Sequence, residues 1–569
     1  MTRIRWATIP FVGLVALTLA CGGAAAPTAT VAPAPAVAAT ATRAPAAAAA
    51  TATPVGAPAP TVVAMAKPSG QAIVALAGVL GAAGGQGGRG DLDPGNWVGG
   101  SRGLYRVIYE PLAYTNPMDP TGRDYLSPIL ATGWEVSKDG LAWTISLRKG
   151  VKFHNGEGLT AQVMARNIER YNGIGLGLLH QNRTAIEFPD TNTLVLRFKE
   201  PNLGLLAQLV HTTRAGYPVP GGYLDKYGKD VPSTDIRNHP IGTGPYKFVS
   251  MDTVTDGLVM EAWEDWGGYW GFKPTVKTIR LVGSPEDTTR MAMLATGEAD
   301  LAAFIPGPYL KEARGFTVKN YLSVRTDWSY FLRQTHADSP YSNVKVRQAL
   351  NYAVDKEAII KAVLGGAGIP VGQNIALVQF GYNPDVKPYP YDPQKARQLL
   401  TEAGYPSGFD GGRIVSTDAP TRNVNLAIAD FFGKVGVRLE IAIMDGAQHS
   451  QRVRRPIHDL DKDMSMTTSA SSLGGEADYR IEFAITSNGL WSYTNDAEID
   501  ALYARSTRAA TQSERERLIQ MAALRSNEQA TMLFLWNRQS VYGWGSRIAD
   551  WTLTPGEDVF DNAQSIRLK

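Results

Sequence analysis

The chain contains a single cysteine, Cys21, so no intramolecular disulfide can hold it together. Any folded part must therefore be stabilised by its own hydrophobic core. The cysteine follows a leader with two positive residues, Arg3 and Arg5, and an apolar stretch at residues 7–20 that Pro10 interrupts. That stretch has the length of a signal peptide and is too short to span a bilayer comfortably. The leader therefore predicts export from the cytoplasm.

The residues around Cys21 resemble a bacterial lipoprotein processing site. Ala20 is the small residue expected before the cleaved bond, while Thr18 occupies the position where an aliphatic residue is usual. An ordinary secretion signal with a cysteine near the cut is the alternative. We expect a signal peptide at residues 1–20 and lipidation of Cys21, because several acyl chains together hold a protein firmly to a membrane.

Residues 22–70 contain no aromatic and no acidic residue, and Arg43 and Lys67 are their only charges. Such a segment cannot bury enough apolar surface to offset the entropy lost on ordering. We therefore predict a disordered, partly polyproline tether at residues 21–70. Its reach is roughly 40 Å as a coil and about 150 Å as polyproline II.

About 500 residues remain for folded structure, which is enough for two or three domains. The formal net charge is +3, to which Arg3 and Arg5 of the leader contribute two units. A nearly neutral chain lacks the basic surface that nucleic-acid binding requires. The twelve Trp and twenty-three Tyr residues fit either ordinary core packing or a ligand cavity with aromatic walls.

Two short motifs indicate enzyme chemistry, and neither has the context that it needs. Residues 85–90 form a GxGxxG pattern, but the following 91–94 (DLDP) breaks a helix instead of starting one. Residues 99–103 form a GxSxG pattern around Ser101, which requires a preceding strand, and 94–98 is a poor strand. A secreted serine hydrolase using Ser101 therefore remains the alternative, with a loop or helix-capping role as the simpler explanation for this serine.

The remaining pattern is that of an α/β protein. A turn at Asp139 and Gly140 predicts a hairpin between strands at 134–137 and 142–147. A short strand is expected at 151–154, and Thr160 suits the N-cap of a helix at 161–171. Further helices are predicted at 285–296, 344–364, 392–403, 427–435, 498–508 and 513–529. Gly297 should end the first of these, and Pro393 lies in the first turn of the helix at 392–403. Further strands are expected at 71–80, 193–199, 278–282, 328–333, 437–444, 531–536 and 541–544.

The segment 239–248 carries two glycines and two prolines directly before a predicted strand. This composition is typical of a rigid connection between domains.

A series of short motifs adds a resemblance to a known family. In order along the chain they are 109–112 (YEPL), 139–143 (DGLAW), 147–154 (LRKGVKFH), 241–246 (IGTGPY), 269–270 (YW), 297–300 (GEAD), 346–350 (VRQAL), 391–393 (YDP) and 402–404 (EAG). Together they resemble the family 5 extracytoplasmic solute-binding proteins of ABC transporters, of the oligopeptide-, dipeptide- and nickel-binding type. The resemblance covers about residues 71–569.

The resemblance implies an α/β fold of the periplasmic-binding-protein-like type II (cluster C) kind. This fold is a clamp with two lobes and an extra domain in the N-terminal lobe. The first lobe would comprise 71–113, 239–327 and 533–569, the accessory domain 114–238, and the second lobe 328–532. A solute bound between two such lobes shifts the population toward the closed state, because the closed state contacts it from both sides.

The resemblance also implies which residues contact the solute. Asp478 lies in an Ala-Asp-Tyr sequence similar to the motif whose aspartate receives the α-amine in peptide-binding relatives. A surface-loop aspartate is the alternative. In relatives the loop after 92–94 lines the pocket, which points to Trp97, Gly99 and Ser101.

By their position, Trp328, Tyr330 and Trp491 are further aromatic ligand-binding candidates, with core packing as the alternative for each. The chain departs from peptide-binding relatives at 480–483 (RIEF), at Gly446 and in the small, polar 467–475. These departures imply a roomier or differently shaped pocket.

Nickel and haem also lie within the range of the family. His449 and His458 are the candidate metal ligands, but a lone histidine is more often a surface residue and the sequence has no close His/Cys cluster. We therefore expect no metal site and no cofactor.

The resulting prediction is a lipid-anchored, extracytoplasmic solute-binding subunit of an ABC importer. It would capture a peptide or a similar small polar solute by lobe closure and deliver it to a membrane permease. We expect no enzymatic activity, no nucleic-acid partner and a monomeric module. A non-transport surface receptor or chaperone on the same fold is a further alternative.

Overall fold

The chain is described from a computed structural model. The described residues are 67–569, with gaps at 77–91, 97–105, 115–125, 172–179, 181, 213, 228–233, 270–272, 304, 306–308, 310–314, 418, 454–463, 472–476 and 553–562. The chain divides into two units, Met1–Val55 and Gly56–Lys569, and all described residues belong to the second. The leader, Cys21 and nearly all of the predicted tether lie outside the described residues, so the signal peptide, the lipidation and the tether all remain predictions.

The largest sheet has eleven strands in the described part of the chain. Ten follow the order β15-β14-β16-β12-β17-β11-β1-β10-β9-β8, and β13 pairs with β17. The strands are β1 (Ser69–Leu76), β8 (Tyr246–Asp252), β9 (Gly257–Ala262), β10 (Val276–Gly283), β11 (Leu301–Ala303), β12 (Thr317–Phe331), β13 (Gly368–Pro370), β14 (Phe409–Ser416), β15 (Val437–Ile443), β16 (Met464–Ser471) and β17 (Met532–Trp544).

In one half of this sheet, β1 lies between β10 and β11 and is parallel to both. Its apolar residues are buried in a nearly continuous run, as expected for a strand covered on both faces. Strands β8, β9 and β10 continue the sheet as antiparallel neighbours. The following helix α7 (Asp287–Thr296) ends at Gly297 as predicted, and this glycine adopts a left-handed conformation.

A separate four-stranded antiparallel sheet, in the order β4-β5-β7-β6, lies within the residues predicted for the accessory domain. The predicted hairpin is confirmed, since Asp139 accepts the amide of Leu141 and Gly140 has φ +72°. Thr160 caps α2 by accepting the amide of Val163 at 3.2 Å, which confirms that prediction too. The strands are β4 (Ala131–Val136), β5 (Ala142–Leu147), β6 (Arg183–Asp190) and β7 (Thr193–Phe198).

The short strand predicted at 151–154 is wrong, because only an isolated bridge between Lys152 and Gly158 forms there. The other described elements between residues 92 and 238 are η1 (Pro94–Asn96), β2 (Ala113–Tyr114), β3 (Ser127–Pro128), α2 (Ala161–Arg170), α4 (Leu205–Ala207), the π-helix η2 (Gln208–Thr212), α5 (Gly221–Tyr227) and α6 (Thr234–Asn238).

In the other half of the large sheet, β14 is parallel to both β15 and β16. Helix α10 (Pro393–Glu402) begins with the predicted proline, and the Asp392 side chain caps it by accepting the amide of Lys395. The remaining elements are η4 (Pro340–Ser342), α8 (Val344–Ala353), α9 (Lys356–Val363), α11 (Ala419–Gly433), α12 (Gly446–Val453), α13 (Ala477–Ile485), α14 (Ala497–Ser506), α15 (Gln512–Glu528), β18 (Ile548–Asp550), η5 (Ala563–Ser565) and β19 (Arg567–Leu568).

The single helix predicted at 344–364 is instead two helices, α8 and α9. Val354 has an extended backbone, and the carboxylate of Asp355 accepts the amide of Ala358 and thereby starts the second helix. The side chain of Lys356 turns back to donate to the carbonyl of Asn351 near the end of α8. The helical spacing of apolar residues continues through this break, because each helix buries one apolar face. The sequence alone therefore predicted a single helix.

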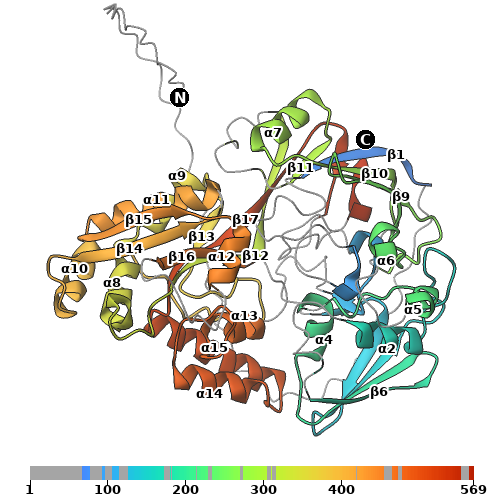
Figure 1. Cartoon of the computed structure of the whole chain (residues 1–569). Coiled ribbons are helices and arrows are strands. Elements are labelled where there is room, and N and C mark those ends of the chain that lie inside the picture. Colours follow the sequence, from blue (N-terminus) through green and yellow to red (C-terminus); the bar gives the residue numbers. More distant parts are fainter. Residues whose placement is uncertain are drawn as a thin grey trace, which may run out of the picture. The chain divides into compact units, whose positions relative to one another are not determined.

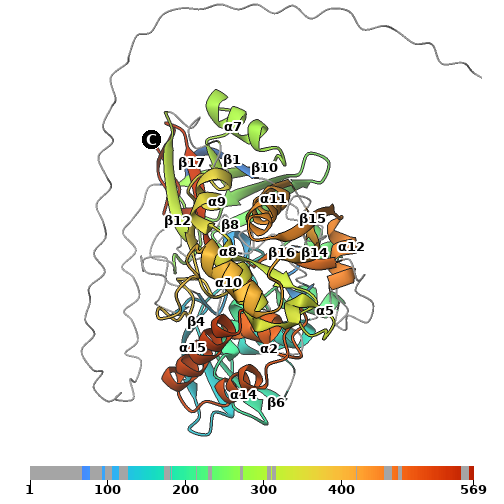
Figure 2. The same ribbon diagram turned by 90° about the vertical axis from the view of Figure 1, so that its left-hand side faces the viewer.

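Strands β12 and β17 join the two halves of the large sheet and lie side by side (Figure 1). The strand predicted at 328–333 covers only the C-terminal end of β12. The strands predicted at 531–536 and 541–544 are the two ends of one continuous strand, β17. Strand β12 has 15 residues and β17 has 13, and their ladder shifts register in two places. Helices α14 and α15 pack against each other (Figure 2), and both contribute residues to the hydrophobic cluster that contains Trp328 and Tyr330 of β12.

Candidate functional site

The carboxyl ends of the parallel strands β14, β15 and β16 lie at one edge of the large sheet. Each strand is followed by a helix that begins near this edge: α11 after β14, α12 after β15 and α13 after β16. In open α/β sheets, ligands bind outside the carboxyl ends of the strands. The candidate site is therefore built from this edge and from the adjoining part of β12.

Helix α13 contains the predicted amine-binding residue. Asp478 is its second residue, and the structure describes the backbone of this residue, not its side chain. The amide of Ala477 at the start of the helix donates to the carbonyl of Phe380 at 3.2 Å. An acidic residue in the first turn of a helix is stabilised by the helix dipole.

A second acidic residue, Glu482, lies one turn after Asp478 on α13. Residues four apart on a helix share a face. Burial raises the pKa of the Glu482 carboxyl, and a hydrogen bond with Tyr503 opposes that shift. No role was predicted for Glu482, although its spacing of four residues from Asp478 is a signal that could have identified it.

Two aromatic candidates, Trp328 and Tyr330, lie two residues apart on β12 and therefore on one face of the strand. Their rings meet edge to face with centroids 5.7 Å apart, and Tyr330 meets Tyr493 in the same way at 5.0 Å. Trp328 and Tyr330 are each 3% exposed. They belong to one hydrophobic cluster with Ala477 and Ile481 of α13.

The indole N–H of Trp328 is buried and has no hydrogen-bond acceptor among the described residues. Leaving such a donor unsatisfied costs about 1–3 kcal/mol, so it usually marks a position that a water molecule or a ligand fills. The sequence placed Trp328 among the candidates by position alone, without this observation.

The third aromatic candidate, Trp491, is half-buried and packs against the same cluster. Its amide donates to the carbonyl of Phe483 at the end of α13 at 2.9 Å. The structure thus brings Trp328, Tyr330 and Trp491 together with the helix that carries Asp478. Tyr493, which joins them, was missed because nothing in its local sequence distinguishes it.

A polar network lies on the opposite face of β12. The Ser329 hydroxyl contacts that of Thr468 at 2.6 Å, and Thr468 donates to the side-chain oxygen of Asn425 on α11. Nearby, Nε2 of His449 on α12 contacts the Thr467 hydroxyl at 2.8 Å. Burial lowers the pKa of His449, so the ring is neutral at physiological pH.

The described residues contain no group of three or more His, Cys, Asp or Glu side chains that could hold a metal ion. His449 is instead engaged with a threonine hydroxyl, and His458 lies outside the described residues.

Trp97, Gly99 and Ser101 also lie outside the described residues, but the segment that leads to them is described. Asp93, which is fully buried, pairs with Arg170 of α2 at 2.6 Å. The same carboxylate accepts the amide of Gly95 at 2.9 Å. A side chain at Gly95 would collide with the Arg170 guanidinium, because its Cβ would lie 2.5 Å from Cζ.

The predicted connecting segment around 241–246 is held by His154. Its Nδ1 accepts the amide of Gly242 at 3.3 Å, and its Nε2 lies 2.9 Å from the carbonyl of Gly244. Together these contacts indicate the neutral tautomer with the proton on Nε2. Burial lowers the pKa of His154 to about 4.

Comparison with known proteins identifies the family. The sequence model of the bacterial extracellular solute-binding proteins, family 5, matches residues 126–489, which is more than half of the chain. The chain belongs to this family.

Two curated relatives illustrate the range of solutes in the family. Heme-binding protein A of Haemophilus influenzae is 29% identical over 491 residues, covering 77% of this chain and 84% of the relative. The glutathione-binding protein GsiB of Salmonella typhimurium is 33% identical over 362 residues, covering 62% of this chain and 68% of the relative.

Solved structures confirm the predicted type II binding-protein fold. NikA from Brucella suis, in complex with Fe(III)-EDTA, superimposes with a TM-score of 0.74 at 21% identity, covering 88% of this chain and 100% of NikA. DppA from Helicobacter pylori, in complex with the peptide STSA, gives 0.70 at 24% identity, covering 88% of this chain and 98% of DppA.

Membership in the family establishes the broad class of activity. Family 5 proteins are extracytoplasmic solute-binding components of ABC transporters that bind peptides or similar ligands, and they are not enzymes. The serine hydrolase alternative at Ser101 is therefore not supported. No helix in the described part of the chain combines the length and the apolar character needed to span a bilayer.

Proposed function

We propose that this protein captures a small polar solute with a free amine, such as a short peptide, and delivers it to an ABC permease. One observation carries the proposal. Helix α13, which carries Asp478 and Glu482, packs through Ala477 and Ile481 against a buried aromatic cluster, and the indole N–H of Trp328 in this cluster has no acceptor among the described residues. The arrangement offers acceptors for a cation and a donor for an oxygen atom within one region.

In this proposal, the carboxylates of Asp478 and Glu482 receive the ammonium group of the solute. A charge-assisted hydrogen bond to an ammonium is about twice as strong as a neutral one when water is excluded. A cation beside Glu482 would favour the ionised carboxylate and so oppose the rise in pKa that burial causes.

The aromatic residues would supply contact area and one further hydrogen bond. The Trp328 indole N–H would donate to a carbonyl or carboxylate oxygen of the solute, while Tyr330 and Trp491 would pack against its carbon atoms. The segment carrying Trp97, Gly99 and Ser101 would contact the solute from the first lobe. Closure of the lobes would then retain the solute, since the closed state gains contacts from both sides.

The test is calorimetric titration of the purified protein with reduced glutathione, the tetrapeptide Ser-Thr-Ser-Ala, its N-acetylated form, haem and a neutral sugar. We expect binding of a free-amine peptide and loss of binding on N-acetylation. Asp478→Asn should weaken binding by about tenfold or more, because the ammonium then loses an ionised partner. Binding of haem alone, or equal binding of acetylated and free peptides, would contradict the proposal.

We also propose that Cys21 carries the lipid that anchors a monomeric protein to the outer face of the membrane. The proposal rests on the leader and on the small residues around Cys21. Mass spectrometry of the protein extracted from its native membrane should show a lipid-modified N-terminal cysteine, and Cys21→Ser should release the protein. A water-soluble parent without added lipid mass would contradict it.

A further inference from the structure

The ladder between β12 and β17 contains an irregular segment close to the candidate site. Between two ladder pairs, β12 has three residues, 323–325, where β17 has only one, Arg538. We refer to residues 323–325 as the β12 bulge. The extra residues cannot use their carbonyl groups in the regular ladder, and buried carbonyls require other partners.

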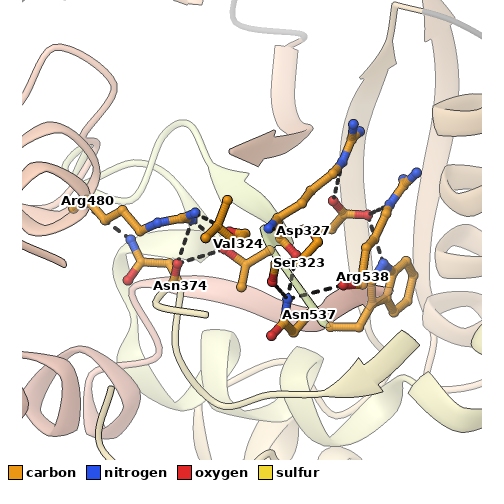
Figure 3. A network of polar contacts seen from close by, with 10 residues as sticks. Ser323, Val324, Asp327, Asn374, Arg480, Asn537 and Arg538 are labelled. Carbon is orange, nitrogen blue, oxygen red and sulfur yellow. Dashed lines mark hydrogen bonds and ion pairs between the residues drawn. The ribbon is translucent and has the colours of Figure 1, made fainter. Parts of the chain in front are cut away.

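All three carbonyls of the β12 bulge are taken by side chains from elsewhere (Figure 3). Asn537 of β17 donates through Nδ2 to the carbonyls of Ser323 at 2.7 Å and Arg325 at 2.8 Å. Arg480 of α13 donates through Nη2 to the carbonyl between them, that of Val324. One of the three bulge carbonyls therefore depends on the helix that carries Asp478.

Arg480 makes further contacts that fix its position. Nη1 donates to the Thr326 hydroxyl at 2.6 Å and to the carbonyl of Asn374 at 2.9 Å. The Asn374 side chain in turn donates to the Arg480 carbonyl at 3.3 Å, and the Thr326 hydroxyl donates to the Asn374 carbonyl at 2.7 Å. Arg480 is 2% exposed, and Val324, Thr326 and Asn374 are also buried.

The loop that contains Asn374 also contacts β17. The side-chain oxygen of Asn537 accepts the amide of Leu377 at 3.0 Å. The loop that contains Asn374 and Leu377 is thus fastened both to α13, through Arg480, and to β17, through Asn537. The network forms one closed set of contacts among α13, this loop, β12 and β17.

We propose that Arg480 is a positioning residue for solute binding: it ties the orientation of α13, and with it Asp478, to the conformation of the β12 bulge. The inference rests on the proposed function, because it takes α13 as the helix that contacts the solute. Arg480 lies two residues after Asp478 and points its guanidinium to the strands (Figure 3). Binding of a solute at α13 therefore changes the stability of the bulge, and a change in the bulge changes affinity.

The first experiment needs no solute. Backbone hydrogen exchange is measured on the full-length parent, on Arg480→Lys and on Arg347→Lys. Arg347 is the matched control, since it is also buried and donates to carbonyls, those of Gln529 and Tyr341 among them, but it lies on α8.

We expect amides of residues 480–485 to exchange about tenfold faster in Arg480→Lys, because lysine cannot reproduce the forked hydrogen bonds. The control should leave this helix unchanged. Equal exchange in the parent and Arg480→Lys, or an equal increase in both variants, would overturn the proposal. Should Arg480→Lys not fold, Thr326→Val removes one partner of Nη1 and is expected to give a smaller increase in the same amides.

The second experiment adds reduced glutathione and the peptide Ser-Thr-Ser-Ala as probes. In the parent, a bound probe should slow exchange at residues 323–326, and Arg480→Lys should lose this protection and about tenfold in affinity. Arg347→Lys should keep both. Binding in the parent without any change at 323–326 would overturn the coupling. If neither probe binds the parent, the proposed function loses its support, while the first experiment still decides the role of Arg480.

Discussion

Two buried arginines, Arg170 and Arg480, each hold a segment next to or within a predicted solute-binding region, and they do so by different chemistry. Arg170 of α2 meets the carboxylate of Asp93, next to the segment that leads to Trp97. The hydrogen bonds described for Arg480 go to main-chain carbonyls and to the Thr326 hydroxyl. Arg170 thus forms an ion pair, whereas Arg480 supplies donors to carbonyl groups that the regular strand ladder does not use.

This difference predicts different behaviour. Removing one partner of a buried ion pair leaves a buried charge without compensation, so the contact is retained or lost as a whole. Hydrogen bonds to several carbonyls can be lost one at a time, which permits graded movement. We therefore expect the ion pair of Arg170 to behave as a rigid anchor, and the loss of single hydrogen bonds of Arg480 to cause graded changes at α13.

The largest effect is expected at the ion pair. Arg170→Met should lower the free energy of unfolding by about 3–5 kcal/mol, because Asp93 then remains buried without the guanidinium of Arg170. Chemical denaturation measures the loss. Arg166→Met provides the control, since its pair with Asp225 is largely exposed and should contribute less than about 1 kcal/mol.

A double variant, Asp93→Leu with Arg170→Met, sharpens the test. It should be more stable than Arg170→Met alone, because no uncompensated charge remains. A double variant that is no better than the single one would show that Arg170 acts through packing and not through its charge.

A smaller effect is expected from pH at the connecting segment held by His154. The pKa of His154 is about 4 in the folded protein, against 6.5 when unfolded. Between these values the unfolded chain binds a proton that the folded protein does not, so stability falls as pH drops from about 6.5 to about 4. The full shift corresponds to about 3 kcal/mol, and partial exposure of the ring reduces this to about 2 kcal/mol.

Thermal unfolding across this pH range measures the effect. In His154→Gln the fall in stability between pH 6.5 and 4 should be shallower than in the parent. An unchanged slope would mean that the contacts to Gly242 and Gly244 do not depend on the neutral ring.

A third effect tests how tightly Arg170 is packed. Gly95→Ala places a Cβ against the guanidinium, which the ion pair prevents from moving away. We expect a loss of about 1–2 kcal/mol in chemical denaturation. The same substitution made together with Arg170→Met should cost less, and additive losses would contradict this explanation.

The smallest effect concerns the break between α8 and α9. Asp355→Ala removes the N-cap of α9 and should lower stability by about 1 kcal/mol. Differential scanning calorimetry detects such a loss as a lower melting temperature. An unchanged melting temperature would mean that packing alone divides the two helices.

The features that the sequence predicted correctly are mostly local. The hairpin at Asp139 and Gly140, the cap at Thr160 and the glycine that ends α7 each depend on residues within one turn of the chain. The family motifs, read in order, also predicted the fold that the comparisons confirm.

The features that the sequence missed depend on distant partners. The carbonyl groups of the β12 bulge accept hydrogen bonds from Arg480 and Asn537, which lie more than 150 residues further along the chain. A polar stretch within β17 therefore looked like the end of a strand. Trp328 and Tyr330 were proposed from resemblance alone. Their burial against α13, and the lack of an acceptor for the Trp328 indole among the described residues, required the structure.

The β12 bulge also determines which way the following side chains face. Side chains alternate along a strand, so the number of residues in the bulge sets whether Trp328 and Tyr330 lie on one face or the other. Deleting one residue from 323–325 would reverse this alternation and bring Ser329 to the face that Trp328 and Tyr330 now occupy. The length of this short segment, more than its composition, therefore decides whether the aromatic pair or Ser329 lies on the face toward α13.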